Sequence, residues 1–302
     1  MNVRTRRVTA NDVDFAYLEC GTGPLALCLH GFPDCAHTWR HLLPALADAG
    51  FRAVAPWLRG YAPTAVPADG RYQTGALVDD ACALHDALGG DGDAVLIGHD
   101  WGAMTATGAA VFASHRWRRV VTLAVPPFPA IAPAFFAFDQ LKRSWYTFFF
   151  QSPLADSAVA MGDLEFIDRL WADWSPGYAA ADDLGSVKDA LRDPANLAAA
   201  LGYYRAMFQP ERQDPALAAQ QAATTGVPPQ PLLYLHGSDD GCIGAEFGRA
   251  AESILTVPGS RVEIIDGTGH FLHLEAPGMV NRHILGFLAE NHDSVTSSAT
   301  SR

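Results

Sequence analysis

An aspartate stands at the apex of a glycine-rich turn about a third of the way along the chain. An apolar run at residues 95–97 leads into Gly-His-Asp-Trp-Gly at 98–102, and the sequence then predicts a helix that begins near Trp101. Glycine on both sides of Asp100 lets the backbone bend tightly and lets neighbouring elements approach closely. We therefore expect a strand, a sharp turn and a helix, with the Asp100 carboxylate pushed out of the sheet into a cleft.

This position gives Asp100 the chemistry of a nucleophile. A carboxylate is ionised at neutral pH and needs no base to activate it, although it is a weak nucleophile suited to displacement at a strained or halogenated sp3 carbon. The product of such an attack is an ester on the enzyme, which water must then cleave. The alternative interpretation is that Asp100 only caps the helix that follows it. The residues described next favour the nucleophile.

A later turn supplies an acid. Gly-Ser-Asp-Asp at 237–240 follows an apolar run, and an acid in such a place can orient a histidine and stabilise its imidazolium. The G-x-x-D spacing favours Asp240, which leaves Asp239 as a turn residue. No carboxylate ends the predicted strand at 120–125, so we do not expect the acid to come from there.

A histidine on a glycine-flanked loop supplies the base. Gly-Thr-Gly-His at 267–270 follows the last predicted strand. Since Asp100 needs no base, His270 is expected to activate the water that hydrolyses the ester. The nearby His273 is expected to be structural.

The segment His-Gly-Phe-Pro-Asp at 30–34 follows another continuous apolar run, at residues 25–29. The loop after this strand and the residue after the nucleophile are the two places from which backbone amides can bind a developing oxyanion. We expect the amides of Phe32 and Trp101 to form this oxyanion hole when water attacks the ester. The alternative is an ordinary turn at a strand end, shaped by Pro33.

The composition of the whole chain narrows the class of protein that holds these residues. The chain has 302 residues, of which 49% are hydrophobic and 18% are charged, and its net charge is -12. A negative chain lacks the basic patches that nucleic acids and anionic membranes require, so we expect neither as a partner. There are five cysteines and no C-x-x-C pair, which favours reduced, buried thiols in a cytoplasmic protein and predicts no metal site or cofactor.

One uncharged stretch, residues 120–138, is long enough to cross a membrane. It contains four prolines, at positions 126, 127, 129 and 133, which a regular spanning helix does not tolerate. We interpret it as a buried strand followed by a linker. The first residues of the chain contain three arginines and no apolar core, so no signal peptide is expected there.

Strands and helices alternate on both sides of a helical middle section. Apolar runs that predict strands alternate with amphipathic helices up to about residue 125, and the alternation resumes at residue 232. This pattern predicts an α/β fold with a mostly parallel central sheet flanked by helices and a helical cap inserted after the sixth strand. The predicted parts are the first part of the core at 1–127, the cap at 128–227, the second part of the core at 228–292 and a disordered tail at 293–302.

Taken together, these motifs resemble the α/β-hydrolase-fold epoxide hydrolases, the branch with an aspartate nucleophile that is related to the haloalkane dehalogenases. The resemblance covers nearly the whole chain, and the order nucleophile, acid, histidine agrees with it. The matching segments are HGFPD at 30–34, RGY at 59–61, GHDWG at 98–102, HGSDD at 236–240 and GHFLHLE at 269–275.

The resemblance extends to two segments of the predicted cap. SWYTFFFQ at 144–151 and YYRAM at 203–207 are similar to the segments that carry the two lid tyrosines of this family, which places the pair at Tyr146 and Tyr204. Phenols stay protonated at neutral pH and can bind and protonate the alkoxide that forms when an epoxide opens. The alternative is that these aromatic residues simply line a pocket.

The resemblance implies an epoxide hydrolase that forms a vicinal diol, with a small epoxide and water as its partners. The implied catalytic and substrate-binding residues are Asp100, Asp240, His270, Tyr146, Tyr204, Phe32 and Trp101. Two alternatives stay open: a haloalkane or haloacid dehalogenase that uses the same triad, and a binding module without activity. Phe32 disfavours the dehalogenase, since those enzymes commonly carry asparagine or glutamate there. A homodimer is also left open.

Overall fold

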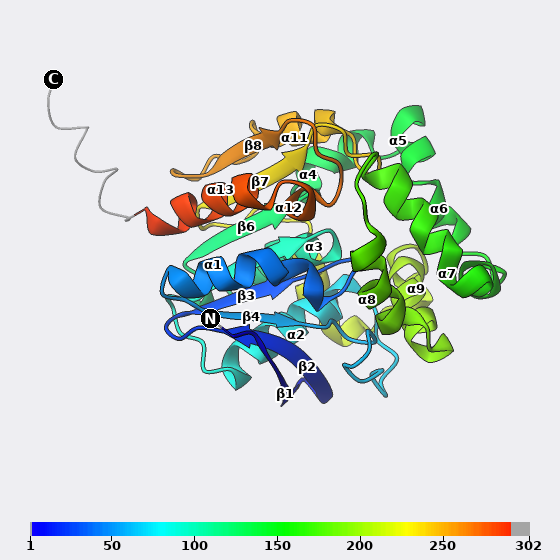
Figure 1. The fold of residues 1–302 in the computed structure, drawn as a ribbon, viewed down its shortest axis with the longest axis horizontal. Helices are drawn as coiled ribbons and strands as arrows, with labels where there is room; N and C mark the ends of the chain where they lie inside the picture. Colours follow the sequence, from blue (N-terminus) through cyan, green and yellow to red (C-terminus); the bar gives the residue numbers. More distant parts are fainter. Residues whose placement is uncertain (1, 291–302) are drawn as a thin grey trace, which may run out of the picture.

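A single eight-stranded sheet forms the centre of the molecule (Figure 1). The computed structural model describes residues 2–290, and the order of the strands in the sheet is β1-β2-β4-β3-β5-β6-β7-β8. The strands are β1 (Arg4–Ala10), β2 (Val13–Cys20), β3 (Leu25–Leu29), β4 (Arg52–Pro56), β5 (Val95–His99), β6 (Arg119–Leu123), β7 (Leu232–Gly237) and β8 (Arg261–Ile265).

The sheet is parallel except at one edge. The pairings of β1 with β2 and of β2 with β4 are antiparallel, and every pairing from β4 to β8 is parallel. Every residue of β3, β5, β6 and β7 is buried, as expected for parallel strands that are covered on both faces. Strand β1, at the edge, is largely exposed and carries three arginines, which discourages pairing with another chain. The predicted α/β-hydrolase fold class is confirmed.

The helices are arranged around this sheet. Before the middle section they are η1 (Ala36–His41), α1 (Leu42–Asp48), α2 (Thr74–Ala87), α3 (Trp101–Phe112) and η2 (Ser114–Arg116), and after it they are α11 (Ala245–Ala251), α12 (Leu272–Glu275) and α13 (Pro277–Ala289). Helices α1, α12 and α13 cover the face of the sheet that is turned toward the viewer in Figure 1, and α2 and α3 lie behind it.

The middle section is helical, as predicted. Its elements are α4 (Phe128–Ile131), η3 (Ala132–Ala134), α5 (Phe138–Arg143), α6 (Trp145–Phe149), α7 (Ala155–Trp174, with a kink at Met161–Leu164), α8 (Ala181–Leu191), α9 (Pro194–Phe208), η4 (Pro210–Arg212), η5 (Pro215–Leu217) and α10 (Ala218–Ala223). Helices α5 to α9 gather beyond one end of the sheet (Figure 1). Helix α10 packs against α2 and α3, and α4 against α11, so both ends of this section rest on the core. The predicted cap limits, 128 and 227, stay predictions.

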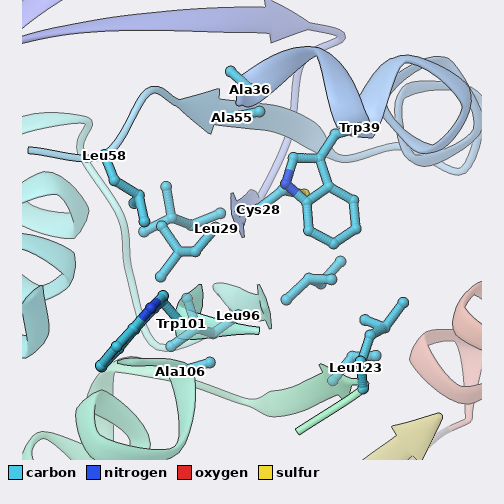
Figure 2. Close-up of a cluster of buried hydrophobic side chains, with 14 of the residues drawn as sticks. Cys28, Leu29, Ala36, Trp39, Ala55, Leu58, Leu96, Trp101, Ala106 and Leu123 are labelled. Carbon is cyan, nitrogen blue, oxygen red and sulfur yellow. The ribbon is translucent and has the colours of Figure 1, made fainter. Parts of the chain in front are cut away.

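A continuous apolar core fills the space between sheet and helices. Figure 2 shows a part of it, in which Cys28 and Leu29 of β3 lie between the rings of Trp39 and Trp101. All five cysteines are buried and unpaired.

The uncharged stretch at 120–138 forms most of β6 and then two short helices, in place of the expected linker. Within residues 2–290, no helix combines the length and the apolar character that a membrane crossing requires. The predicted tail at 293–302 lies outside the described residues.

Candidate active site

Asp100 occupies the turn between β5 and α3. Its φ of 53° and ψ of -118° lie outside the regions that non-glycine residues usually adopt, a kind of strain that concentrates at functional sites. The neighbouring glycines are required by close contacts. A Cβ on Gly98 would lie 2.0 Å from the carbonyl oxygen of Gly102, and a Cβ on Gly102 would lie 2.0 Å from that of Leu29. The local sequence therefore folds into the sharp turn that the pattern predicted.

The Asp100 carboxylate meets the loop that follows β3. The amide of Phe32 donates a hydrogen bond of 2.8 Å to Oδ1 of Asp100. Gly31 allows this approach, because a Cβ at that position would lie 2.3 Å from the same oxygen. The side chain of Phe32 is fully buried against Phe150 and Tyr204, so the group that this residue offers to the site is its backbone amide.

His270 lies between two carboxylates. Its Nδ1 is 3.0 Å from Oδ2 of Asp240, and its Nε2 is 3.6 Å from Oδ2 of Asp100. A carboxylate oxygen only accepts hydrogen bonds, so Nδ1 carries a hydrogen and donates it to Asp240. The other oxygen of Asp240 accepts from the amides of Cys242 (2.7 Å) and Ile243 (2.9 Å). The fold thus brings Asp100, His270 and Asp240 together from three separate strand ends.

The two carboxylates control the charge of His270. Burial alone would lower the pKa of this imidazole, but the negative charges of Asp240 and Asp100 raise its pKa to about 10. In turn, burial raises the pKa of Asp240, and its contact with His270 overcomes this and lowers its pKa. At neutral pH, His270 is therefore an imidazolium as long as Asp100 is negatively charged.

Asp239 and His273 lie apart from this arrangement. Asp239 is exposed, and its carboxylate accepts a bond from the Ser238 hydroxyl. His273 is buried, stacks on Trp39 with 5.0 Å between ring centroids, and shares a hydrogen bond of 2.5 Å with Thr38. These placements agree with a turn residue and a structural histidine.

Tyr146 and Tyr204 come from different helices of the middle section, α6 and α9. Their ring centroids are 5.6 Å apart, and both side chains line a cavity of about 380 Å³ that also borders Asp100 and Trp101. The Tyr146 hydroxyl lies 3.3 Å from Sγ of Cys242, whereas the Tyr204 hydroxyl is buried and has no partner within residues 2–290. Burial and the charge of Asp100 raise the pKa of both phenols, so both remain hydrogen-bond donors.

Sequence reasoning missed the contacts that hold the His270 loop. Glu275 accepts hydrogen bonds from the Ser175 hydroxyl (2.6 Å) and from the amide of Gly269 (2.9 Å). The Ser175 hydroxyl also accepts from the amide of Phe271, 3.0 Å away. Ser175 follows helix α7, so the middle section supports the loop that carries the histidine. The motif at 269–275 contains Glu275, but nothing in the sequence points to Ser175.

Two groups of potential metal ligands occur within the described residues. In each, three ligand atoms lie within 4.8 Å of one another. One group contains Asp240 and His270, which already bind each other, and adds Cys242. The other consists of Asp34, His99 and His273, all buried. The hydrogen bond between Asp240 and His270 accounts for the first group without a metal ion.

The chain is similar to known proteins in both sequence and fold. A family model described as the alpha/beta hydrolase fold matches residues 24–277. Epoxide hydrolase A of Mycobacterium tuberculosis is 30% identical over 94% of this chain and 96% of its own length, and an epoxide hydrolase of Caballeronia sordidicola is 30% identical over 95% and 94%. The solved structure of epoxide hydrolase A from Mycobacterium thermoresistibile superposes with a TM-score of 0.80 at 27% identity, covering 95% of this chain and 98% of that one.

Proposed function

The chain belongs to the alpha/beta hydrolase fold family, alongside its epoxide hydrolases, and from this premise we propose that it hydrolyses an epoxide to a vicinal diol. The observation that carries the proposal is the pairing of a carboxylate with two phenols across one cavity. Asp100 borders the cavity on the sheet side, and Tyr146 and Tyr204 border it from the helical section. An epoxide needs both: a nucleophile for its carbon and a donor for its oxygen.

In the first step, a carboxylate oxygen of Asp100 attacks one ring carbon of the epoxide. The carbon–oxygen bond of the strained ring breaks, and its electron pair stays on the oxygen as an alkoxide. The hydroxyls of Tyr146 and Tyr204 bind this oxygen and supply its proton, which stabilises the charge where it develops. The product is an alkyl ester of Asp100 that carries a neighbouring hydroxyl group.

Formation of the ester prepares His270 for the second step. The ester is neutral, so one of the two charges that hold the pKa of His270 near 10 disappears, and that pKa falls. His270 can then lose its proton and become a base. The proton that it releases balances the proton that a tyrosine gave to the alkoxide.

In the second step, water attacks the carbonyl carbon of the ester. Nε2 of His270 takes a proton from the water, while Asp240 stabilises the imidazolium that forms. The amides of Phe32 and Trp101 bind the oxyanion; the Phe32 amide already donates to Oδ1 of Asp100 in the free protein. Collapse of this intermediate breaks the bond between the carbonyl carbon and the alkyl oxygen. The leaving oxygen takes up the proton of the carboxylic acid that forms on Asp100, which gives the diol and the Asp100 carboxylate and leaves His270 as the imidazolium of the starting state.

A parallel assay separates this reaction from that of a dehalogenase. Purified protein is given styrene oxide, 1-chlorohexane and para-nitrophenyl acetate, and diol, halide and nitrophenolate are measured in the same samples. We expect diol from the epoxide, with no halide and no ester cleavage above that of the Asp100→Asn variant. Halide release without any diol would overturn the proposal, and turnover of none of the substrates would support a binding module.

A further inference from the structure

The cavity beside Asp100 carries almost no charge. Among residues 2–290, no lysine, arginine or histidine contributes to its wall, and Asp100 is the one acidic residue there. The large apolar side chains of the wall are Met104, Val125, Phe128, Ile131, Phe135, Phe136, Met207, Phe208 and Ile243. A volume of about 380 Å³ is in the range of small-molecule sites. The cavity thus has room for a ring or a short alkyl chain beside the epoxide.

Six serine and threonine hydroxyls line the cavity, and those of Thr74, Thr107 and Ser144 are neutral groups that could face a substrate. The other three are committed to the protein. Thr147, Thr224 and Thr225 each donate their one hydroxyl proton to the carbonyl oxygen three residues earlier, over 2.7–2.8 Å. They have no proton left to give to an anion. The two phenols face the cavity as well, but the proposed function assigns them to the epoxide oxygen.

Among residues 2–290, a negatively charged substituent would therefore find no cation in the wall of this cavity to compensate its charge. A carboxylate that leaves water without a compensating cation loses much of its solvation, and the charge of Asp100 repels it in addition. On the basis of the proposed function, we infer that the substrates are uncharged aryl or alkyl epoxides, and that epoxides with a carboxylate or phosphate close to the ring are excluded.

A matched pair of substrates tests this inference. The methyl ester and the free acid of 4-carboxystyrene oxide differ in the charge of the para substituent and in one methyl group. We expect kcat/KM for the ester to exceed that for the acid by at least about 100-fold, since a loss of about 2.8 kcal/mol corresponds to that factor. Similar values for the two would overturn the charge selection alone. Absence of diol from both and from styrene oxide would overturn the proposed function itself.

A charge placed in the wall gives the complementary test. Met207 is half-buried on α9 and lines the cavity, so Met207→Lys adds a cation there. We expect the ratio of kcat/KM for the acid to that for the ester to rise at least tenfold. Phe112→Lys is the control: it adds the same charge at an exposed position, eleven residues along α3 from Trp101 and so about 16 Å away. An equal change of the ratio in both variants would contradict a local effect.

A second inference rests on a separate contact, between a thiol and one of the two phenols. Cys242 is 1% exposed, lines the cavity, and has its Sγ 3.3 Å from the Tyr146 hydroxyl. Its backbone is fixed from two sides. Its amide donates to Asp240, and its carbonyl accepts a bond of 2.9 Å from the buried Gln140 of α5. The thiol is therefore held between the acid of the triad and the helical section.

The direction of the bond between Cys242 and Tyr146 has a chemical consequence. A phenol has one proton, so Tyr146 can donate to a substrate oxygen only while it does not donate to the thiol, and its own oxygen can then accept from the thiol. Burial and the charge of Asp240 raise the pKa of the Cys242 thiol well above its usual value, so the thiol keeps a proton to give. Sulfur is also a weak acceptor and competes poorly for the phenol proton.

We propose that Cys242 is a positioning residue for Tyr146 in the reaction proposed above. Its S–H donates to the phenol oxygen and turns the phenol proton toward the epoxide oxygen. Tyr204 has no such partner within residues 2–290, so the two phenols are not equivalent. The effect of the thiol belongs to ester formation, because hydrolysis of the ester does not use the phenols.

A double-mutant cycle on the rate of ester formation, measured in single turnovers, tests this role. Cys242→Ala is expected to lower that rate about threefold to tenfold in the wild-type and Tyr204→Phe backgrounds, the range of one net hydrogen bond, and to leave it unchanged in Tyr146→Phe. Cys242→Ser, which keeps a donor and nearly the same volume, should restore most of the rate. An equal loss in the Tyr146→Phe background would show a merely structural role and overturn the proposal. Absence of any ester in the parent protein would instead overturn the proposed function.

Discussion

The two sides of the cavity are built in different ways. On the sheet side, the groups of the triad lie close to one another: Asp240 accepts three hydrogen bonds, one of them from His270, and Nε2 of His270 lies 3.6 Å from the Asp100 carboxylate. On the helical side, the hydroxyl of Tyr146 lies against the Cys242 thiol, and the hydroxyl of Tyr204 has no hydrogen-bond partner within residues 2–290. The sheet side is a chain of groups that depend on one another. In the proposed reaction, the helical side offers two donors of the same kind to one substrate oxygen.

This difference predicts different responses to substitution. Removal of a group that has one role and that no other residue can replace is expected to abolish turnover. Of two donors that bind the same oxygen, either can retain part of the function of the pair. Variants of the two sides test this difference, and the largest effect is expected on the sheet side.

The largest effect is expected from Asp100→Asn. The amide has nearly the shape of the carboxylate, but it is neutral and cannot displace oxygen at carbon. We expect diol formation to fall on the order of 10⁴–10⁶-fold, as for the loss of other covalent nucleophiles, with unchanged circular dichroism. Diol formation at the parental rate, in protein checked by mass spectrometry for deamidation back to aspartate, would rule out the covalent mechanism.

The next effect concerns the two phenols. Either single variant, Tyr146→Phe or Tyr204→Phe, should retain measurable epoxide opening, because one donor remains. Removal of one oxyanion donor typically costs on the order of 10²–10³-fold, so the double variant should lose more than about 10³-fold and should no longer form the ester. Parental rates in the double variant would show that the helical side does not assist ring opening.

A pair of neighbouring residues tests the sheet side. Asp240→Ala removes the partner of His270 and is expected to lower kcat about 10³–10⁴-fold, as for the acid of comparable triads. Asp239→Ala is the matched control: it alters an exposed carboxylate one position earlier and should stay within about threefold of the parent. The reverse ranking would assign the acid to Asp239.

The smallest effect concerns the pH dependence of stability. His270 holds its proton up to about pH 10 in the folded state, whereas an unfolded histidine releases it near pH 6.5. Between these values the folded state binds the extra proton, so its contribution is complete below pH 6.5 and declines as the pH rises toward 10, by at most about 1.4 kcal/mol per pH unit. Urea unfolding at pH 7 and pH 9 should show a steeper decline for the parent than for His270→Gln. Parallel declines would contradict an ion pair at His270.

The sequence predicted the sheet side well because its residues lie in short motifs at strand ends. The order of buried strands fixes where such ends meet, so the turn at Asp100 and the loops of Asp240 and His270 could be placed together from local patterns. It also predicted the helical section and, through the family resemblance, the two tyrosines.

Other parts of the site depend on contacts between distant segments. Gln140 and Cys242 are 102 residues apart in the chain, and Ser175 and Glu275 are 100 residues apart. Neither pair forms a pattern in the sequence, because the packing of the helical section on the core brings its members together. For the same reason, the sequence predicted the Phe32 amide at the site but did not show that the Phe32 side chain, expected to bind substrate, is buried in the core.

The central claim, a covalent ester on Asp100 that His270 helps to hydrolyse, has a direct test. His270→Gln protein is mixed with styrene oxide, quenched and examined by intact mass spectrometry and peptide mapping. The account predicts an adduct with the mass of one styrene oxide on the peptide that contains Asp100, formed in the His270→Gln protein and absent from the Asp100→Asn/His270→Gln double variant. Normal diol turnover by His270→Gln, or an adduct that persists without the Asp100 carboxylate, would contradict it.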